Sequence, residues 1–149
     1  MIRTIIFSGL TTVAFGLLYQ VSGSTLWVAG LIGIVAWVFA ALTKLIPGAG
    51  LLADFVGAFV IGALAEWAAS WKRRPVVLFV VPAIISFVPG YLVYKSMVDF
   101  LKNNFMSGLQ VALNALFAAA ALSLGLALAS SIFRPILHRA RRARKARQM

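Results

Sequence analysis

Long apolar runs with almost no charged residues are the feature that most constrains this chain. A helix needs about 20 apolar residues to cross a bilayer. Five such runs can be drawn, over residues 2–19, 25–43, 51–71, 76–94 and 109–133. The chain is 62% hydrophobic, whereas soluble domains are about 45–50% apolar, so the excess has to face lipid. The sequence therefore predicts an all-α integral membrane protein, a bundle of about five transmembrane helices.

Basic residues are concentrated in two places. Of the 14 Lys and Arg residues, seven lie in Arg134–Arg147 and three in Lys72–Arg74. With five spans both groups fall on one side, which the positive-inside rule makes cytoplasmic. We expect a multi-pass protein of the cell's inner (plasma) membrane with its N-terminus outside. Residues 1–133 would form the membrane domain, and residues 134–149 a basic cytoplasmic tail that contacts anionic lipid rather than nucleic acid.

Small residues four positions apart recur within the runs. Ala58 and Gly62 form one such pair, and Gly125 and Ala129 form another. Such pairs let helix backbones approach closely in lipid. Two interpretations are open: tight packing within one bundle, or a surface for a second membrane subunit.

Two acids, Asp54 and Glu66, lie in the third run. Acids within a membrane typically mark ion or substrate pathways. Alternatively each anchors its end of the helix at headgroup level, with Glu66 paired to Lys72–Arg74. As pathway residues they are candidates for coupling a proton to transport, and Glu66 is favoured because partial burial of an acid disfavours its charged form and brings its titration closer to neutral pH.

Catalytic and metal-binding patterns are not recognisable. The chain has no cysteine and a single histidine, and no nucleophile stands in a recognisable arrangement with a base. We therefore expect no enzyme activity, no cofactor and no metal site.

Two prolines and a glycine interrupt the fourth run, in the stretch VVPAIISFVPGY. Proline lacks the backbone N–H and clashes with the carbonyl four residues earlier. One interpretation is a simple kink. The other is a helix broken at Pro-Gly, the form in which many transporters bind substrate. On the second interpretation the substrate-binding residues are Ser86, Pro89, Gly90, Tyr91 and Tyr94.

The stretch from Gly62 to Met97, GALAEWAASWKRRPVVLFVVPAIISFVPGYLVYKSM, resembles the corresponding part of the threonine/serine exporter (ThrE-like) family. That family has a basic loop ending in proline, then a helix with Pro-Gly near its middle and a following tyrosine. Pro75, Pro89, Gly90 and Tyr94 fit this pattern. The alanine-rich last run is similar too, so the resemblance covers about the last two thirds of the chain.

The resemblance implies a small subunit of a split exporter, equivalent to the C-terminal five-span half. Its partner would be a larger membrane subunit resembling the N-terminal half. Together with the broken helix, this predicts a secondary exporter of small carboxylate-bearing metabolites, either threonine- or serine-like amino acids or small organic acids. The rival interpretation is a non-transporting membrane scaffold or assembly subunit, recruited through its small-residue faces.

Overall fold

The computed structural model describes residues 2–21 and 23–146, with the side chains of residues 6–21 and 23–136. Within these ranges every regular element is helical, which confirms the all-α class. The elements are α1 (Ile2–Leu18), α2 (Gly23–Thr43), α3 (Gly50–Lys72), α4 (Val77–Ile84), the short 3₁₀ helix η1 (Ile85–Phe87), α5 (Gly90–Leu101) and α6 (Phe105–Ala146).

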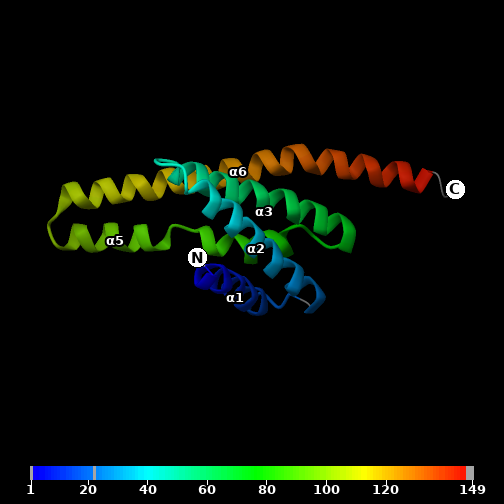
Figure 1. Ribbon diagram of the computed structural model, residues 1–149, viewed down its shortest axis with the longest axis horizontal. Helices are drawn as coiled ribbons and strands as arrows, with labels where there is room; N and C mark the ends of the chain where they lie inside the picture. The colour runs from blue at the N-terminus through cyan, green and yellow to red at the C-terminus, as the bar shows by residue number, and fades with distance from the viewer. Residues whose placement is uncertain (1, 22, 147–149) are drawn as a thin grey trace.

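The helices α1 to α4 form a bundle along one side of the long helix α6 (Figure 1). Helix α3 contacts α6, α2 and α4, and α1 closes the far side through α2 and α4. Helix α5 packs antiparallel to the first part of α6, and this hairpin projects beyond the bundle (Figure 1). The core of the bundle therefore lies around α3.

Helices α3 and α6 meet through small residues. A Cβ atom placed on Gly125 would lie 2.5 Å from the carbonyl oxygen of Phe55 and 3.0 Å from Cβ of Ala58. One turn further along α3, a Cβ atom on Gly62 would lie 2.6 Å from Cβ of Ala129. The two small-residue pairs thus pack against each other within this chain, as the interpretation of tight packing in one bundle predicts.

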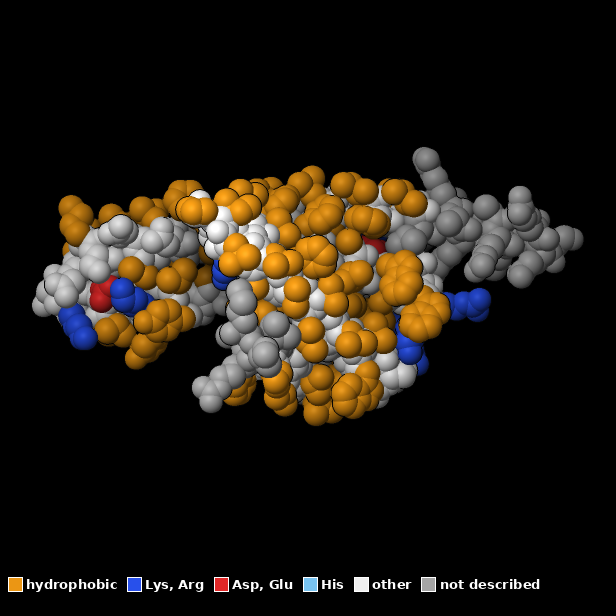
Figure 2. All heavy atoms as spheres, viewed as in Figure 1, with side chains coloured by type: hydrophobic (Ala, Val, Ile, Leu, Met, Phe, Trp, Pro, Cys, Tyr) orange, Lys and Arg blue, Asp and Glu red, His pale blue; other side chains and the backbone are white. Residues whose placement is uncertain are grey.

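The buried face of α6 is a single narrow stripe. After Gly108, its buried residues recur every three or four positions: Ala115, Ala118, Leu122, Gly125 and Ala129. Large apolar side chains on its other faces are exposed, including Leu116, Phe117 and Leu124. Apolar side chains likewise cover most of the bundle face seen in Figure 2. This surface suits lipid or another membrane helix.

Three helices are long and apolar enough to cross a bilayer: α2, α3 and the part of α6 from Phe105 to Ile136. A fourth span results if Val77–Phe87 and Gly90–Leu101, which are bent by 45° to each other, count as one. Helix α1 has 17 residues, fewer than the roughly 20 that a span needs. The described residues therefore contain three to four candidate spans, and the count of five stays a prediction.

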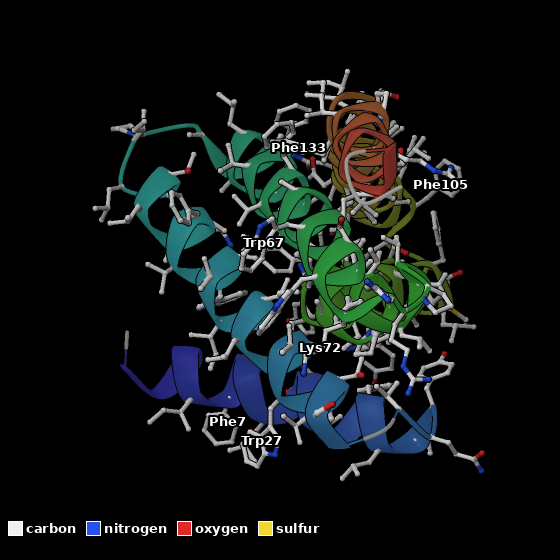
Figure 3. All side chains as sticks on the ribbon, turned by 90° about the vertical axis from the view of Figure 1, so that its right-hand side faces the viewer. Phe7, Trp27, Trp67, Lys72, Phe105 and Phe133 are labelled. Carbon is white, nitrogen blue, oxygen red and sulfur yellow. The ribbon has the colours of Figure 1, made fainter. Side chains whose placement is uncertain are left out.

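The loops α1–α2 and α3–α4 lie at the end of the bundle toward which the C-terminal half of α6 runs (Figure 1). Figure 3 looks onto this end, with Trp27, Trp67 and Lys72 labelled. Trp27, Trp67 and Trp71 are all exposed. The structure thus gathers the basic loop, the exposed tryptophans and the C-terminal part of α6 at one end, and the orientation in the membrane stays a prediction.

The connection between α5 and α6 is short. The charged residues among 95–104 suggest a loop over that whole stretch, but α5 ends at Leu101 and α6 begins at Phe105. Helix α5 continues to Leu101, past the expected end at Tyr94. The N–H of Asn104 donates to the carbonyl of Asp99 (3.0 Å), and the hydroxyl of Ser107 donates to the Asp99 carboxylate (2.9 Å). Asn103 takes the left-handed conformation, at φ 61°. These bonds close a tight turn that a charge pattern alone does not reveal.

The α3–α6 contact gives a stability prediction. Gly125→Ala places a methyl group against the fixed backbone of Phe55, so the helices have to separate. Overpacking of this kind costs about 1–3 kcal/mol, and we expect a lower melting temperature in detergent. The matched control is Gly23→Ala, where a Cβ would meet nothing within 4 Å. An unchanged melting temperature for Gly125→Ala would show that the contact is looser than described.

Candidate functional site at the break between α4 and α5

The backbone leaves the helical path at Val88 and Pro89. Val88 has φ −59° and ψ 128°, the extended conformation into which a following proline forces its neighbour. Pro89 has φ −77° and ψ 46°. The N–H of Gly90 turns back to the carbonyl of Val88 (2.8 Å), and the N–H of Val93 makes the first bond of α5, to the carbonyl of Pro89 (3.1 Å).

The two prolines of this region act differently. Pro82 lies inside α4, which continues past it to Ile84. Its side chain is almost completely buried. Pro89 instead coincides with the end of the helical path, and a glycine follows it. The bend of 45° between Val77–Phe87 and Gly90–Leu101 therefore centres on the second proline.

A small polar cluster ties the break to α1 and α2. The hydroxyl of Ser86 lies 3.5 Å from the carbonyl oxygen of Ser8, which also accepts a bond from the Thr12 hydroxyl at 2.9 Å. The hydroxyl of Ser8 lies 3.5 Å from the carbonyl oxygen of Gly33. Ser8 and Thr12 are both buried. Sequence reasoning missed them, although two hydroxyl residues four positions apart in an apolar helix are a usable signal.

Aromatic packing holds the other side of the break. Phe87 of η1 lies edge-on to Trp37 of α2, with ring centroids 5.7 Å apart. The Phe87 ring also fills the space beside Gly57 of α3, where a Cβ atom would collide with it. Above Trp37 lies the ammonium of Lys44, with Nζ 5.4 Å from the ring centroid. Lys44 and Trp37 are a second pair that the sequence did not single out.

Of the two predicted acids, Asp54 is the one near the break. It precedes Gly57 by three residues, about 4.5 Å along the axis of α3. Its side chain is partly buried, and the charge of Lys44 acts on its carboxylate. Glu66 is nine residues beyond Gly57, about 14 Å further along the helix. The structure therefore separates the two acids and places the one favoured by sequence at the opposite end.

The expected pairing of Glu66 with the basic loop is wrong for the side chains that the structure describes. Glu66 is buried, at 9% exposure, but no ion pair joins it to Lys72, Arg73 or Arg74. Lys72 lies over the ring of Trp71 instead, with Nζ 5.3 Å from the centroid. For Lys72 the reason is geometric, because residues six positions apart project about 120° apart around a helix. Arg73 is the left-handed residue that ends α3, at φ 54°.

The predicted binding residues divide into two groups. Ser86 and Pro89 are partly buried at the break, and Gly90 has open space around its Cα. Tyr91 and Tyr94 are 72% and 66% exposed on α5. The structure therefore brings the first three residues together and leaves both tyrosine rings on the outer surface of α5.

Hydroxyl groups of η1 and α1 lie at the break, namely those of Ser86, Ser8 and Thr12. The Lys44 ammonium lies one aromatic ring further away, over Trp37. Among the residues with described side chains, no three His, Cys, Asp or Glu gather as a metal site would require.

Comparison with known families gives a match over residues 4–132, to the family described as Threonine/Serine exporter, ThrE. No curated protein and no solved structure matches the chain. The matched range includes α1 and α2, which the sequence motifs did not cover. It extends through the break and along α6 as far as Ile132. Because the match spans well over half of its length, the chain belongs to the Threonine/Serine exporter, ThrE, family of membrane transport proteins.

Proposed function

We propose that this chain is one subunit of a split secondary exporter of small carboxylate-bearing metabolites. Family membership supports export of threonine- or serine-like compounds. Members of the family can pair with a companion subunit, and a second, larger membrane subunit is the partner we propose. The observation that carries the proposal is the interrupted helix α4–η1–α5, which we interpret as one broken membrane span.

The break supplies a place for a carboxylate. The N–H groups in the first turn of a helix have no acceptor within that helix. At α5 the N–H of Gly90 already bonds the carbonyl of Val88, which leaves those of Tyr91 and Leu92 for a ligand. Helix N-termini of this kind attract anions, and transporters use half-helix N-termini for substrate carboxylates. The hydroxyl of Ser86 adds a donor two residues before the extended backbone. Tyr91 and Tyr94 are proposed to contact substrate from the companion's side of α5.

The exposed faces of α5 and α6 support the need for a companion. The hairpin carries exposed Tyr91, Tyr94, Leu101, Phe105 and Met106, and α6 buries only one stripe within the chain. A substrate at the break would stay open to lipid unless another membrane helix covered it. We propose that the companion covers this side, with the N-terminus outside and the basic tail on anionic lipid of the cytoplasmic leaflet.

Coupling to a proton gradient is assigned to Asp54 rather than Glu66. The coupling group has to respond to substrate bound at the break. Asp54 lies within one helical turn of Gly57, which packs against the ring of Phe87. Glu66 stays a candidate only for a role at the other end of the bundle. Intramembrane acids in transporters serve such proton steps.

Restoring the helix at the break tests the proposed site. In the double variant Pro89→Ala, Gly90→Ala the backbone regains its N–H donor, so α4 and α5 should join and the site should close. We expect efflux of threonine to fall to the level of cells lacking the protein, with membrane insertion unchanged. The control is Pro135→Ala, at a proline within the continuous helix α6. Efflux retained by the double variant would rule out the break as the binding site.

The companion subunit is tested by purification of the tagged full chain in mild detergent. We expect a larger membrane protein in stoichiometric amount, identified by mass spectrometry, and threonine efflux only when both proteins are expressed. A tagged membrane protein of unrelated fold is the control for adventitious capture. Self-association alone, with efflux by the single chain, would contradict the split arrangement.

Neutralising each acid in turn tests the coupling assignment. Asp54→Asn should remove the response of net efflux to an imposed pH gradient, while exchange of internal for external substrate continues, since exchange needs no net proton movement. Glu66→Gln is the matched comparison and should keep the response. Gradient-driven efflux that survives in Asp54→Asn and fails in Glu66→Gln would reverse the assignment.

A further inference from the structure

Lys44 is an exposed cation at the C-terminal end of α2. It follows the last residue of α2, and its side chain turns over the face of Trp37. The Trp37 ring also makes an edge contact with Phe87. Trp37 therefore links the ammonium to the short 3₁₀ helix that precedes the break. The other described cations lie elsewhere, on the α3–α4 loop, on the α5–α6 hairpin and at Arg134.

The ammonium has two interactions in this structure, and both can be exchanged. A cation over an aromatic face is held only weakly at an exposed site. The second interaction is a longer-range attraction to the carboxylate of Asp54, and no ion pair within 4 Å joins the two described groups. Lysine carries its charge on a flexible four-carbon stem. The side chain can thus leave both partners without disturbing the packing of α2 on α3.

We propose that Lys44 binds the carboxylate of the transported amino acid, with Trp37 holding the ammonium beside the break when no substrate is bound. This inference rests on the proposed function and assigns the charge recognition of the same site. An incoming carboxylate takes the place of Asp54 as the counter-ion of Lys44. The N-terminus of α5 and the ammonium of Lys44 then act on one anionic group from two sides.

The proposal gives a role to the series of contacts that links Lys44 to the break through Trp37 and Phe87. Gly57 has no side chain and leaves space for the ring of Phe87. The Phe87 ring contacts the ring of Trp37, and the Lys44 ammonium lies over the Trp37 ring. A lysine that only anchors the end of α2 at the headgroups would snorkel away from the bundle. Lys44 instead turns back over a ring that is packed against η1.

The test uses two ligands that differ only in the recognised group. L-Threonine carries a carboxylate, whereas L-threoninamide keeps the ammonium and hydroxyl but lacks the carboxylate. Affinities are measured from the ligand-dependent rise in melting temperature of the purified full chain, together with any companion that copurifies. We expect wild type to prefer threonine. Lys44→Gln should lower the affinity for threonine by about 10- to 100-fold, the usual value of a charge-assisted bond. Its affinity for threoninamide should stay within about threefold of the wild-type value.

Two control variants separate recognition from structure. Lys44→Arg keeps the charge and should retain most of the preference for threonine. Lys102→Gln removes an equal charge from the turn after α5 and should change neither affinity. If Lys44 had only a structural role, Lys44→Gln would lower the affinity for both ligands to the same extent, and this result would overturn the proposal. Equal affinity of wild type for the two ligands, or stabilisation by neither, would overturn it as well.

Efflux measured in parallel keeps the two proposals distinguishable. Threonine efflux by wild type without a preference for the carboxylate would leave the exporter standing and remove Lys44 from it. A preference that disappears in Lys44→Gln, in a protein that moves no threonine across the membrane, would support the binding site and contradict the export function.

Discussion

The close contact between α3 and α6 is the constraint on which the rest of the structure depends. Lipid offers helices no hydrophobic reason to associate, so they are held by backbone proximity and dispersion contacts. Gly62 and Gly125 make that proximity available, because neither position has room for a methyl group. Once α3 is fixed on α6, the face that carries Asp54 and Gly57 is directed at the segment between α4 and α5. The position of the candidate site thus follows from a contact that contains none of its residues.

The break is held by its surroundings on three sides. The Ser86 hydroxyl reaches α1, the Phe87 ring packs on α2 and α3, and the N–H of Gly90 is satisfied within the turn. Within the described residues no buried side-chain nitrogen or oxygen lacks a partner. This matters in a membrane, where irregular backbone is tolerated only inside protein or beside water. An interruption supported in this way is a defined structural element, on which a binding site can be built.

Charge is divided between the two ends of the bundle. One end carries the basic loop, the exposed tryptophans and the helical tail, all features of an interface with lipid headgroups. At the other end Lys44 lies over Trp37, whose ring contacts Phe87 of η1, and Asp54 lies about one helical turn from Gly57. The fold thus separates the two groups of charged residues along α3, which is 23 residues long.

The amino-acid sequence by itself determined the helical class, and it predicted the approximate spans and an interruption at Pro-Gly. Each of these depends on local physics: apolar length for a span, and for Pro89 a missing donor and a restricted neighbour. It also marked Ala58, Gly62, Gly125 and Ala129 as contact residues, but not their partners. Only the tertiary structure decided that these two pairs meet, that Asp54 rather than Glu66 lies beside the break, and that Ser8, Trp37 and Lys44 converge there. The reason is that such neighbours come from helices far apart in the chain, and their juxtaposition depends on how helices rotate and cross, which no local pattern specifies.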